Sequence, residues 1–173
     1  MKAVNESKKK DAKYSVLYAD VPWAEQSWSV GSTSGLCVDN WVAKDALLML
    51  WVPNAWVPDG LSVLRSWGFD YVGLLCWKQP EDEVENILPT RICEYMLVGV
   101  RGTVNTPHLL RNMLYEGPVG SGGYKPLGFR RILAGAGYRA FGESANYLDV
   151  FGQYWKNRFP DYEKGSWEFL VDF

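Results

Sequence analysis

Four residues near the amino terminus, Asp20, Val21, Pro22 and Trp23, have the types and the spacing for chemistry on an exocyclic amino group of a purine. The lone pair of such a nitrogen is delocalised into the ring, so a site that methylates it needs two acceptors for its N–H bonds. The Asp20 carboxylate and the Val21 carbonyl can be these acceptors, and Pro22 restricts Val21 to an extended backbone. Trp23 offers a face for the base, where stacking is worth about 1–3 kcal/mol. The same four residues also fit a purely structural interpretation. In that case the strand simply ends in a proline turn, and the tryptophan packs in the core.

The composition limits the classes of protein and of partner. The chain has 173 residues, of which 47% are hydrophobic and 15% aromatic, and this suits one folded domain. No uncharged apolar stretch approaches the ~18 residues of a membrane span, and the polar segment 1–12 lacks the apolar core of a signal peptide. We therefore expect a cytoplasmic protein with a polar tail at 1–12, one domain at 13–173 and no membrane partner. The formal net charge is −2, so contact with nucleic acid should be local or assisted by a partner.

The cysteine and histidine content argues against several kinds of site. Cys37, Cys76 and Cys93 are odd in number and show no CxxC spacing, and His108 is the single histidine. This pattern favours buried free thiols over a zinc cluster or a disulfide framework. A single histidine also weakens any Ser-His or Cys-His scheme. We expect chemistry that uses neither a metal nor a covalent nucleophile.

Apolar segments that alternate with helical patterns predict an α/β fold with a single, mostly parallel sheet and helices on both faces. The expected strands are 14–19, 45–52, 71–77, 92–100 and 147–151, with shorter ones at 113–115 and near the end of the chain. Helices are expected at 60–67, where Gly68 ends the helix, and within 128–138; loops are expected at 24–40, 79–89 and 117–126. In such sheets ligands bind at the carboxyl ends of the strands. The residues expected at these ends are Asp20, Lys78, Gly102 and Gly152.

Six segments resemble the MT-A-seventy family, the S-adenosylmethionine-dependent adenine N6-methyltransferases with a DPPW-type motif. YSVLYADVPW (14–23) is similar to the family's ADPPW segment. The other five follow in the family's order: DALLMLWV (45–52), VLRSWGFDYVGLLCWK (63–78), CEYMLVGVRG (93–102), YKPLGFRRIL (124–133) and YLDVFGQY (147–154). The resemblance spans residues 14–155. It implies a Rossmann-like methyltransferase fold with a circularly permuted motif order.

The resemblance also implies roles for individual residues. Asp20, Val21, Pro22 and Trp23 would form the catalytic corner, and S-adenosyl-L-methionine would be the cofactor. Lys125 would hold the carboxylate of the cofactor, and Glu94 would lie near the site. A buried Glu94 needs a partner, for which Lys125 and Arg91 are candidates. The remaining residues expected at the cofactor, besides Asp20, are Phe151, Gly152, Gln153, Asn157 and Glu168.

Departures from the family pattern leave more than one function open. DVPW replaces DPPW, the acidic pair after the KP dipeptide is absent, and GSWEFL (165–170) stands where the family has its ribose-binding G-N-Q/E. The first hypothesis is methylation of adenine N6 in nucleic acid, with DNA favoured over RNA. The alternative is an inactive methyltransferase-like subunit that scaffolds a partner or binds nucleic acid. A third, weaker hypothesis is methylation of a free nucleotide or modified base. A homodimer or heterodimer fits either of the first two.

Overall fold

The structure is a computed structural model that describes residues 13–23, 30–79, 93–105, 114–118, 125–158 and 167–169. The predictions for the polar tail 1–12, for Arg91 and His108, and for most of the loops 79–89 and 117–126 lie outside these residues. The strands are β1 (Tyr14–Asp20), β2 (Val42–Pro53), β3 (Asp70–Lys78), β4 (Cys93–Arg101), β5 (Leu114–Glu116), β6 (Tyr147–Asp149) and β7 (Glu168–Phe169). The α-helices are α1 (Val30–Ser34), α2 (Val57–Ser66), α3 (Leu127–Phe141) and α4 (Gly152–Arg158), with 3-10 turns η1 (Val38–Asn40), η2 (Asn54–Trp56) and η5 (Gly142–Ser144).

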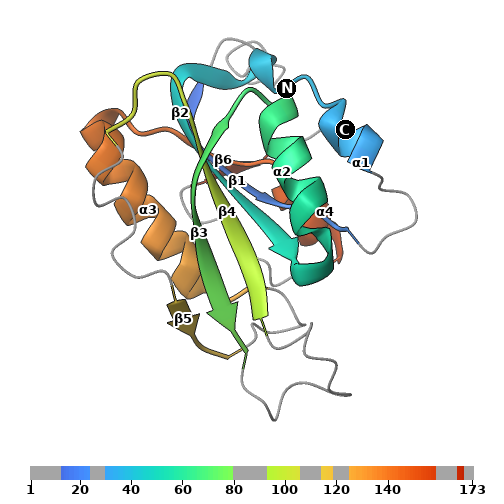
Figure 1. Ribbon diagram of the computed structural model, residues 1–173. Helices are drawn as coiled ribbons and strands as arrows, with labels where there is room; N and C mark the ends of the chain where they lie inside the picture. The colour runs from blue at the N-terminus through green and yellow to red at the C-terminus, as the bar shows by residue number, and fades with distance from the viewer. Residues whose placement is uncertain are drawn as a thin grey trace, which may run out of the picture.

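The described strands form one seven-stranded sheet in the order β5-β3-β4-β2-β1-β6-β7 (Figure 1). The pairs β1–β2, β1–β6, β3–β5 and β6–β7 are parallel, whereas β4 is antiparallel to both of its neighbours, β2 and β3. The other six strands therefore run in one direction and β4 runs against them. This confirms the mixed α/β fold with a mostly parallel sheet.

The direction of β4 decides which strand ends meet. The carboxyl ends of β1, β2, β3 and β6 lie at one edge of the sheet, and β4 brings its amino end, with Glu94, to the same edge. Gly102 follows the carboxyl end of β4, as predicted, but the antiparallel direction of β4 places it at the opposite edge of the sheet. There the backbone N–H of Thr103 donates to Asp45, near the start of β2.

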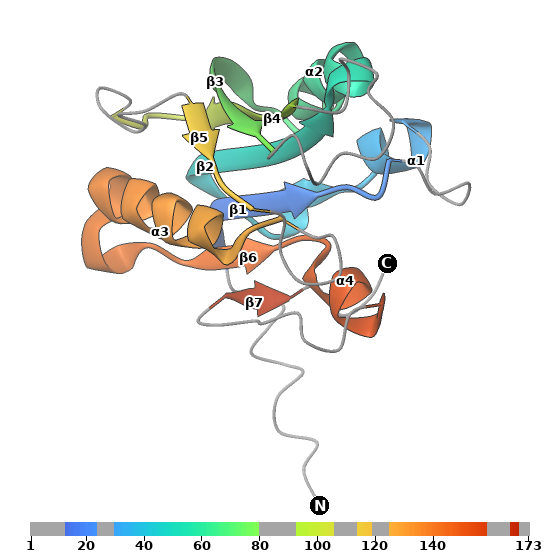
Figure 2. The same cartoon turned by 90° about the horizontal axis from the view of Figure 1, so that it is seen from below.

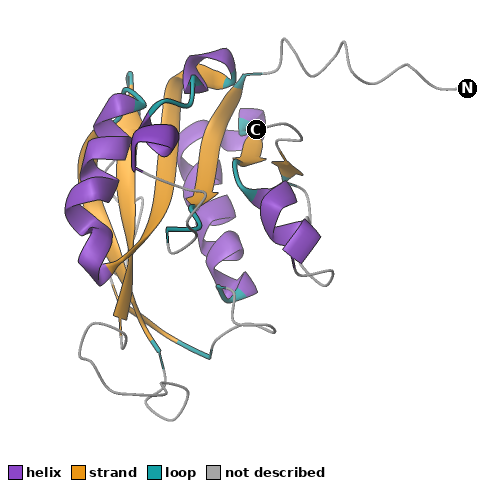
Figure 3. Cartoon of the chain, turned by 90° about the vertical axis from the view of Figure 1, so that its right-hand side faces the viewer, coloured by secondary structure: helices purple, strands orange, loops and turns teal. Residues whose placement is uncertain are grey.

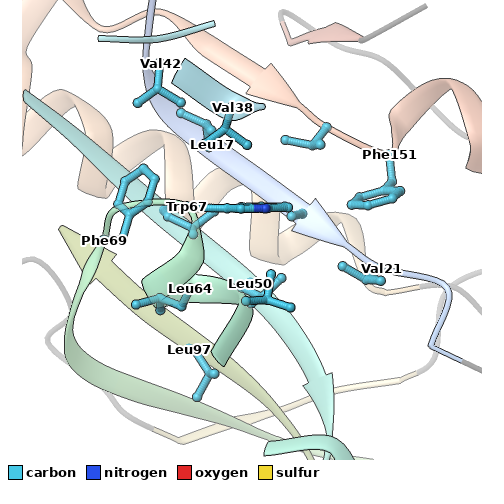
Figure 4. Close-up of a cluster of buried hydrophobic side chains, with 14 of the residues drawn as sticks. Leu17, Val21, Val38, Val42, Leu50, Leu64, Trp67, Phe69, Leu97 and Phe151 are labelled. Carbon is cyan, nitrogen blue, oxygen red and sulfur yellow. The ribbon is translucent and has the colours of Figure 1, made fainter. Parts of the chain in front are cut away.

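Helices cover both faces of the sheet, as the sequence predicts (Figures 1 and 3). On one face α2 contributes Val63 and Leu64 to a cluster of buried side chains that also holds Trp67 and residues of β1 and β2. Figure 4 shows the Trp67 indole between Leu17 and Leu64 in this cluster. On the other face α3 packs Phe129, Leu133 and Ala136 against a second cluster (Figure 2). Three tryptophans are buried in these clusters: Trp51, Trp67 and Trp77.

Two glycines show how the sequence shapes these layers. Gly68 has a φ of 77°, which is left-handed backbone that glycine adopts readily, and its N–H donates to the Arg65 carbonyl, so it ends α2 as predicted. Gly137 lies in α3, where a Cβ would stand 2.7 Å from Val16 Cγ2 and 2.8 Å from Tyr147 Cε1. The missing side chain lets α3 approach β1 and β6 closely.

Several sequence predictions need correction. Residues 24–40 are not wholly a loop, because α1 and η1 occupy part of this range. The three cysteines are free, but Cys37 is exposed and Cys76 and Cys93 are half-buried, so the expectation of buried thiols was wrong. Both half-buried thiols lie on β3 and β4 near the sheet edge rather than in the core. Among the described residues, no helix is both long enough and apolar enough to cross a bilayer.

Candidate functional site

The corner at the end of β1 is built by a three-residue turn. β1 is a fully buried strand between β2 and β6, and Asp20 is its last residue, opposite Trp51 and 4% exposed. The chain then turns, because the Trp23 N–H donates to the Val21 carbonyl at 2.9 Å. Pro22 stands at the centre of this turn, and its fixed φ of about −65° suits an inverse γ-turn. The Val21 carbonyl keeps one of its two lone pairs for another donor.

Trp23 anchors this turn to the sheet. Its indole Nε1 donates to the Trp51 carbonyl at 2.8 Å, and its ring stacks on Trp56 with centroids 5.8 Å apart. The side chain is 7% exposed and belongs to the core cluster on the α2 face. The structure thus gives Trp23 a positioning contact. Its role as a stacking face for a base stays a prediction, which requires the side of the indole away from Trp56.

Three charged side chains meet beside the turn. The Lys125 Nζ, just before α3, lies 2.6 Å from Glu94 Oε2 and 3.7 Å from Asp20 Oδ1. Glu94 is half-buried, and Lys125, one of its two predicted partners, is the cation that pairs with it. The second oxygen of Glu94 accepts a hydrogen bond from Gln79 Nε2 at 3.1 Å. The cluster joins the ends of β1, β3 and β4 to the start of α3.

The Lys125 ammonium rests on an aromatic surface. It lies 5.5 Å from the centroid of the Trp51 ring and 5.9 Å from that of Trp77. Phe129 packs edge-on against both indoles, with centroids 4.7 and 5.8 Å away. A cation within ~6 Å of an indole face is attracted to it, and more strongly when it is desolvated. The aromatic side chains therefore support the ammonium where water is scarce.

The electrostatics of the cluster follow from its burial. Loss of solvation is the main influence on Asp20, and it raises the pKa of this carboxyl from 3.8 to about 6 against the opposing attraction of Lys125. Repulsion from Glu94 adds to the rise. For Lys125, burial alone would lower the pKa, but the attraction of Asp20 and Glu94 outweighs it and raises the pKa. Asp20 is thus a carboxyl that changes charge close to neutral pH beside a firmly protonated lysine.

The segment after β6 closes the corner from the other side. The Val150 N–H donates to the Tyr18 carbonyl at 2.9 Å, and the Trp155 indole of α4 donates to the Asp20 carbonyl at 2.6 Å. Phe151 is buried in the core cluster, and Figure 4 shows Phe151 and Val21 at the same end of this cluster. These contacts bring the start of α4 next to the catalytic corner that the sequence predicts.

The other residues predicted at the cofactor lie farther along this segment. Gly152 is buried at the start of α4. Gln153 Nε2 donates to Asn157 Oδ1 at 2.8 Å, so these two side chains pair along the outside of the helix. Glu168 lies in β7, where its backbone pairs with Leu148 of β6. A cofactor role for Gln153, Asn157 and Glu168 stays a prediction.

Sequence reasoning missed four polar residues of this edge. Gln79 was expected in a loop and Trp155 carried no prediction, and only the fold brings them to Glu94 and Asp20. Arg130 of α3 pairs with Asp149 at the end of β6, and both are buried. A signal for Asp149 existed, because an acid that ends an apolar strand of a parallel sheet stands at the ligand-binding edge.

Comparisons with known proteins add no assignment. No protein-family model matches the chain, and no curated protein matches it. Within the described ranges, no group of three or more His, Cys, Asp and Glu side chains is placed to hold a metal ion. The candidate site is thus defined by its own geometry: a buried acid, an adjacent turn carbonyl and a lysine shared between two carboxylates.

Proposed function

We propose that the protein is an S-adenosylmethionine-dependent methyltransferase with a permuted Rossmann-like fold, which methylates the N6 amino group of adenine in nucleic acid. The observation that carries the proposal is the corner at the end of β1. It places a buried carboxylate, Asp20, next to a carbonyl, Val21, at the carboxyl edge of a mostly parallel sheet. These are the two acceptors that an exocyclic amino group requires.

The residues of the corner act by accepting and orienting. A carboxylate oxygen of Asp20 accepts a hydrogen bond from one N–H of the amino group, and the Val21 carbonyl accepts a hydrogen bond from the other. These two hydrogen bonds direct the lone pair of the nitrogen away from both acceptors. Hydrogen bonds in a dry site are stronger than in water, and fixed acceptors need no reorganisation during the reaction. Methylation makes the N–H bonds acidic, and Asp20, with a pKa of about 6, is suited to take the proton that leaves.

The charges of the cluster fit the proposed cofactor. With all three groups ionised, Asp20, Glu94 and Lys125 carry two negative charges and one positive charge, a net charge of −1. S-adenosylmethionine supplies an electrophilic methyl group on a cationic sulfonium, and a net-negative cluster with a buried Asp20 suits a cation. Asp20 and the segment Phe151, Gly152 and Gln153 are the residues that would hold it.

DNA is the favoured polymer, and RNA is the second choice. The formal net charge of −2 implies a local contact, or one shared with a homodimeric or heterodimeric partner. The alternative function, an inactive subunit that scaffolds a partner, is favoured by one observation. Trp23, the expected stacking face, is 7% exposed and packed on Trp56.

Nucleoside mass spectrometry of DNA and RNA from cells that express the protein tests the proposal. The wild-type chain should produce N6-methyladenine, and the folded variant Asp20→Ala should produce none. Full activity in Asp20→Ala would refute the mechanism. Calorimetry with S-adenosylmethionine separates the alternative, because an inactive scaffold would show no binding at millimolar cofactor.

A further inference from the structure

We infer that Lys125, Glu94 and Gln79 form a positioning chain that controls the charge of Asp20, and that Lys125 does this instead of binding the carboxylate of a ligand. The inference rests on the proposed function for its catalytic meaning, but its geometry stands independently. It departs from the role that the family resemblance implies for Lys125.

The ammonium of Lys125 already lies beside two carboxylates of this chain. An ammonium has three N–H donors and no acceptor. Two of its partners are carboxylates, Glu94 at 2.6 Å and Asp20 at 3.7 Å, and the indoles of Trp51 and Trp77 lie against it. A ligand carboxylate at Lys125 would be a third carboxylate beside these two, and like charges in a buried site repel strongly.

Glu94 is held so that it can keep Lys125 in place. One of its oxygens faces Lys125 and the other accepts from Gln79 at 3.1 Å, so each oxygen has its own donor. Glu94 pairs with Trp77 across β3 and β4, and Gln79 directly follows β3. The paired strands therefore hold Glu94 and Gln79 next to Lys125, whose side chain is 15% exposed.

The charged groups around Asp20 act on it in opposite directions. Lys125 favours the ionised carboxylate and Glu94 disfavours it, while Arg130 of α3, paired with Asp149 of β6, favours it. Removal of Lys125 and neutralisation of Glu94 should therefore displace the titration of Asp20 in opposite senses. A purely structural role would give no such opposition.

Carbon-13 NMR titration of the Asp20 carboxyl tests this without cofactor or nucleic acid. Lys125→Met should move the midpoint upward by about one pH unit or more, and Glu94→Gln should move it downward. Lys125→Arg retains the positive charge, so the Asp20 midpoint in this variant should stay near that of the wild type. Glu94→Gln keeps the shape of the side chain, so the test stands even if Lys125→Met does not fold.

Lys78 and Glu116 offer a matched control pair at the same edge of the sheet. Their side chains lie 3.7 Å apart and are 43% and 64% exposed. Lys78→Met and Glu116→Gln make the same changes of charge in solvent and should leave the Asp20 midpoint in place. The inference is overturned if the Lys125 and Glu94 variants move the midpoint in the same sense, or not at all. Failure of the proposed function would appear separately, as absent methyl transfer with the opposed titrations intact.

Discussion

Asp20 should make the protein less stable as the pH rises, because burial disfavours its charged form. Its pKa is raised from 3.8 to about 6 in the folded protein. A tenfold change in an equilibrium constant corresponds to about 1.4 kcal/mol, so this displacement is worth about 3 kcal/mol. The stabilisation is fully present below about pH 4, is lost as the pH rises through about 6, and stays lost above it.

The variant Asp20→Asn removes this dependence while it keeps the size of the side chain. Relative to the wild type, its free energy of unfolding should increase by up to about 3 kcal/mol between about pH 4 and about pH 8. Most of the change should fall between about pH 4 and pH 6. An acidic group at an active site that destabilises the fold is a common cost of function.

Urea unfolding, followed by tryptophan fluorescence at a series of pH values, measures this difference. Asp70→Asn is the matched control, because Asp70 is exposed at the start of β3, at the other edge of the sheet. It makes the same change in net charge away from the site. A stability difference between Asp20→Asn and wild type that stays flat across this range would refute the account of a desolvated, ionisable Asp20.

Two further predictions concern α3. Gly137→Ala should lower the free energy of unfolding by about 1–3 kcal/mol, because the added methyl group overlaps side chains of β1 and β6. Gly135→Ala, where the nearest atom is 3.4 Å from the new Cβ, should instead be neutral or stabilising by up to about 1 kcal/mol; urea unfolding compares the two, and equal effects would contradict the packing argument. Arg130→Met should cost about 3–5 kcal/mol, because it removes the cation paired with buried Asp149. The double variant Arg130→Met/Asp149→Asn should recover most of this loss in the same assay, and no recovery would argue against the pair.

The sequence allowed a correct prediction of the layers but not of the direction of β4. Continuous apolar segments indicate that a strand is covered on both faces. The same pattern does not reveal whether such a strand runs parallel or antiparallel to its neighbours. Gly102 was therefore placed at the wrong edge, whereas Glu94 reached the expected site through the amino end of its strand. Glycines are poor helix formers, yet the predicted helix within 128–138 forms, and Gly137 lies where α3 approaches β1 and β6 closely.

The candidate site likewise contains residues that could be predicted from the sequence and residues that could not. Asp20 and its turn could be predicted because a strand end, an acid and a proline lie next to one another in the chain. The partner of Glu94 could be narrowed to Lys125 and Arg91, because a buried carboxylate requires a cation. Gln79 and Trp155 could not be predicted, since their contacts join segments 15 and 135 residues apart. The buried placement of Trp23 depends on Trp56, which no local pattern connects to it.

The central claim is that the corner at Asp20 transfers a methyl group to adenine N6. The most direct measurement incubates the purified protein with adenine-containing DNA or RNA oligonucleotides and S-adenosylmethionine that carries an isotope-labelled methyl group. Mass spectrometry of the nucleosides should find labelled N6-methyladenine with the wild-type chain and none with folded Asp20→Ala. A wild-type protein that binds the cofactor but labels neither polymer, or a variant that labels as well as the wild type, would contradict the account.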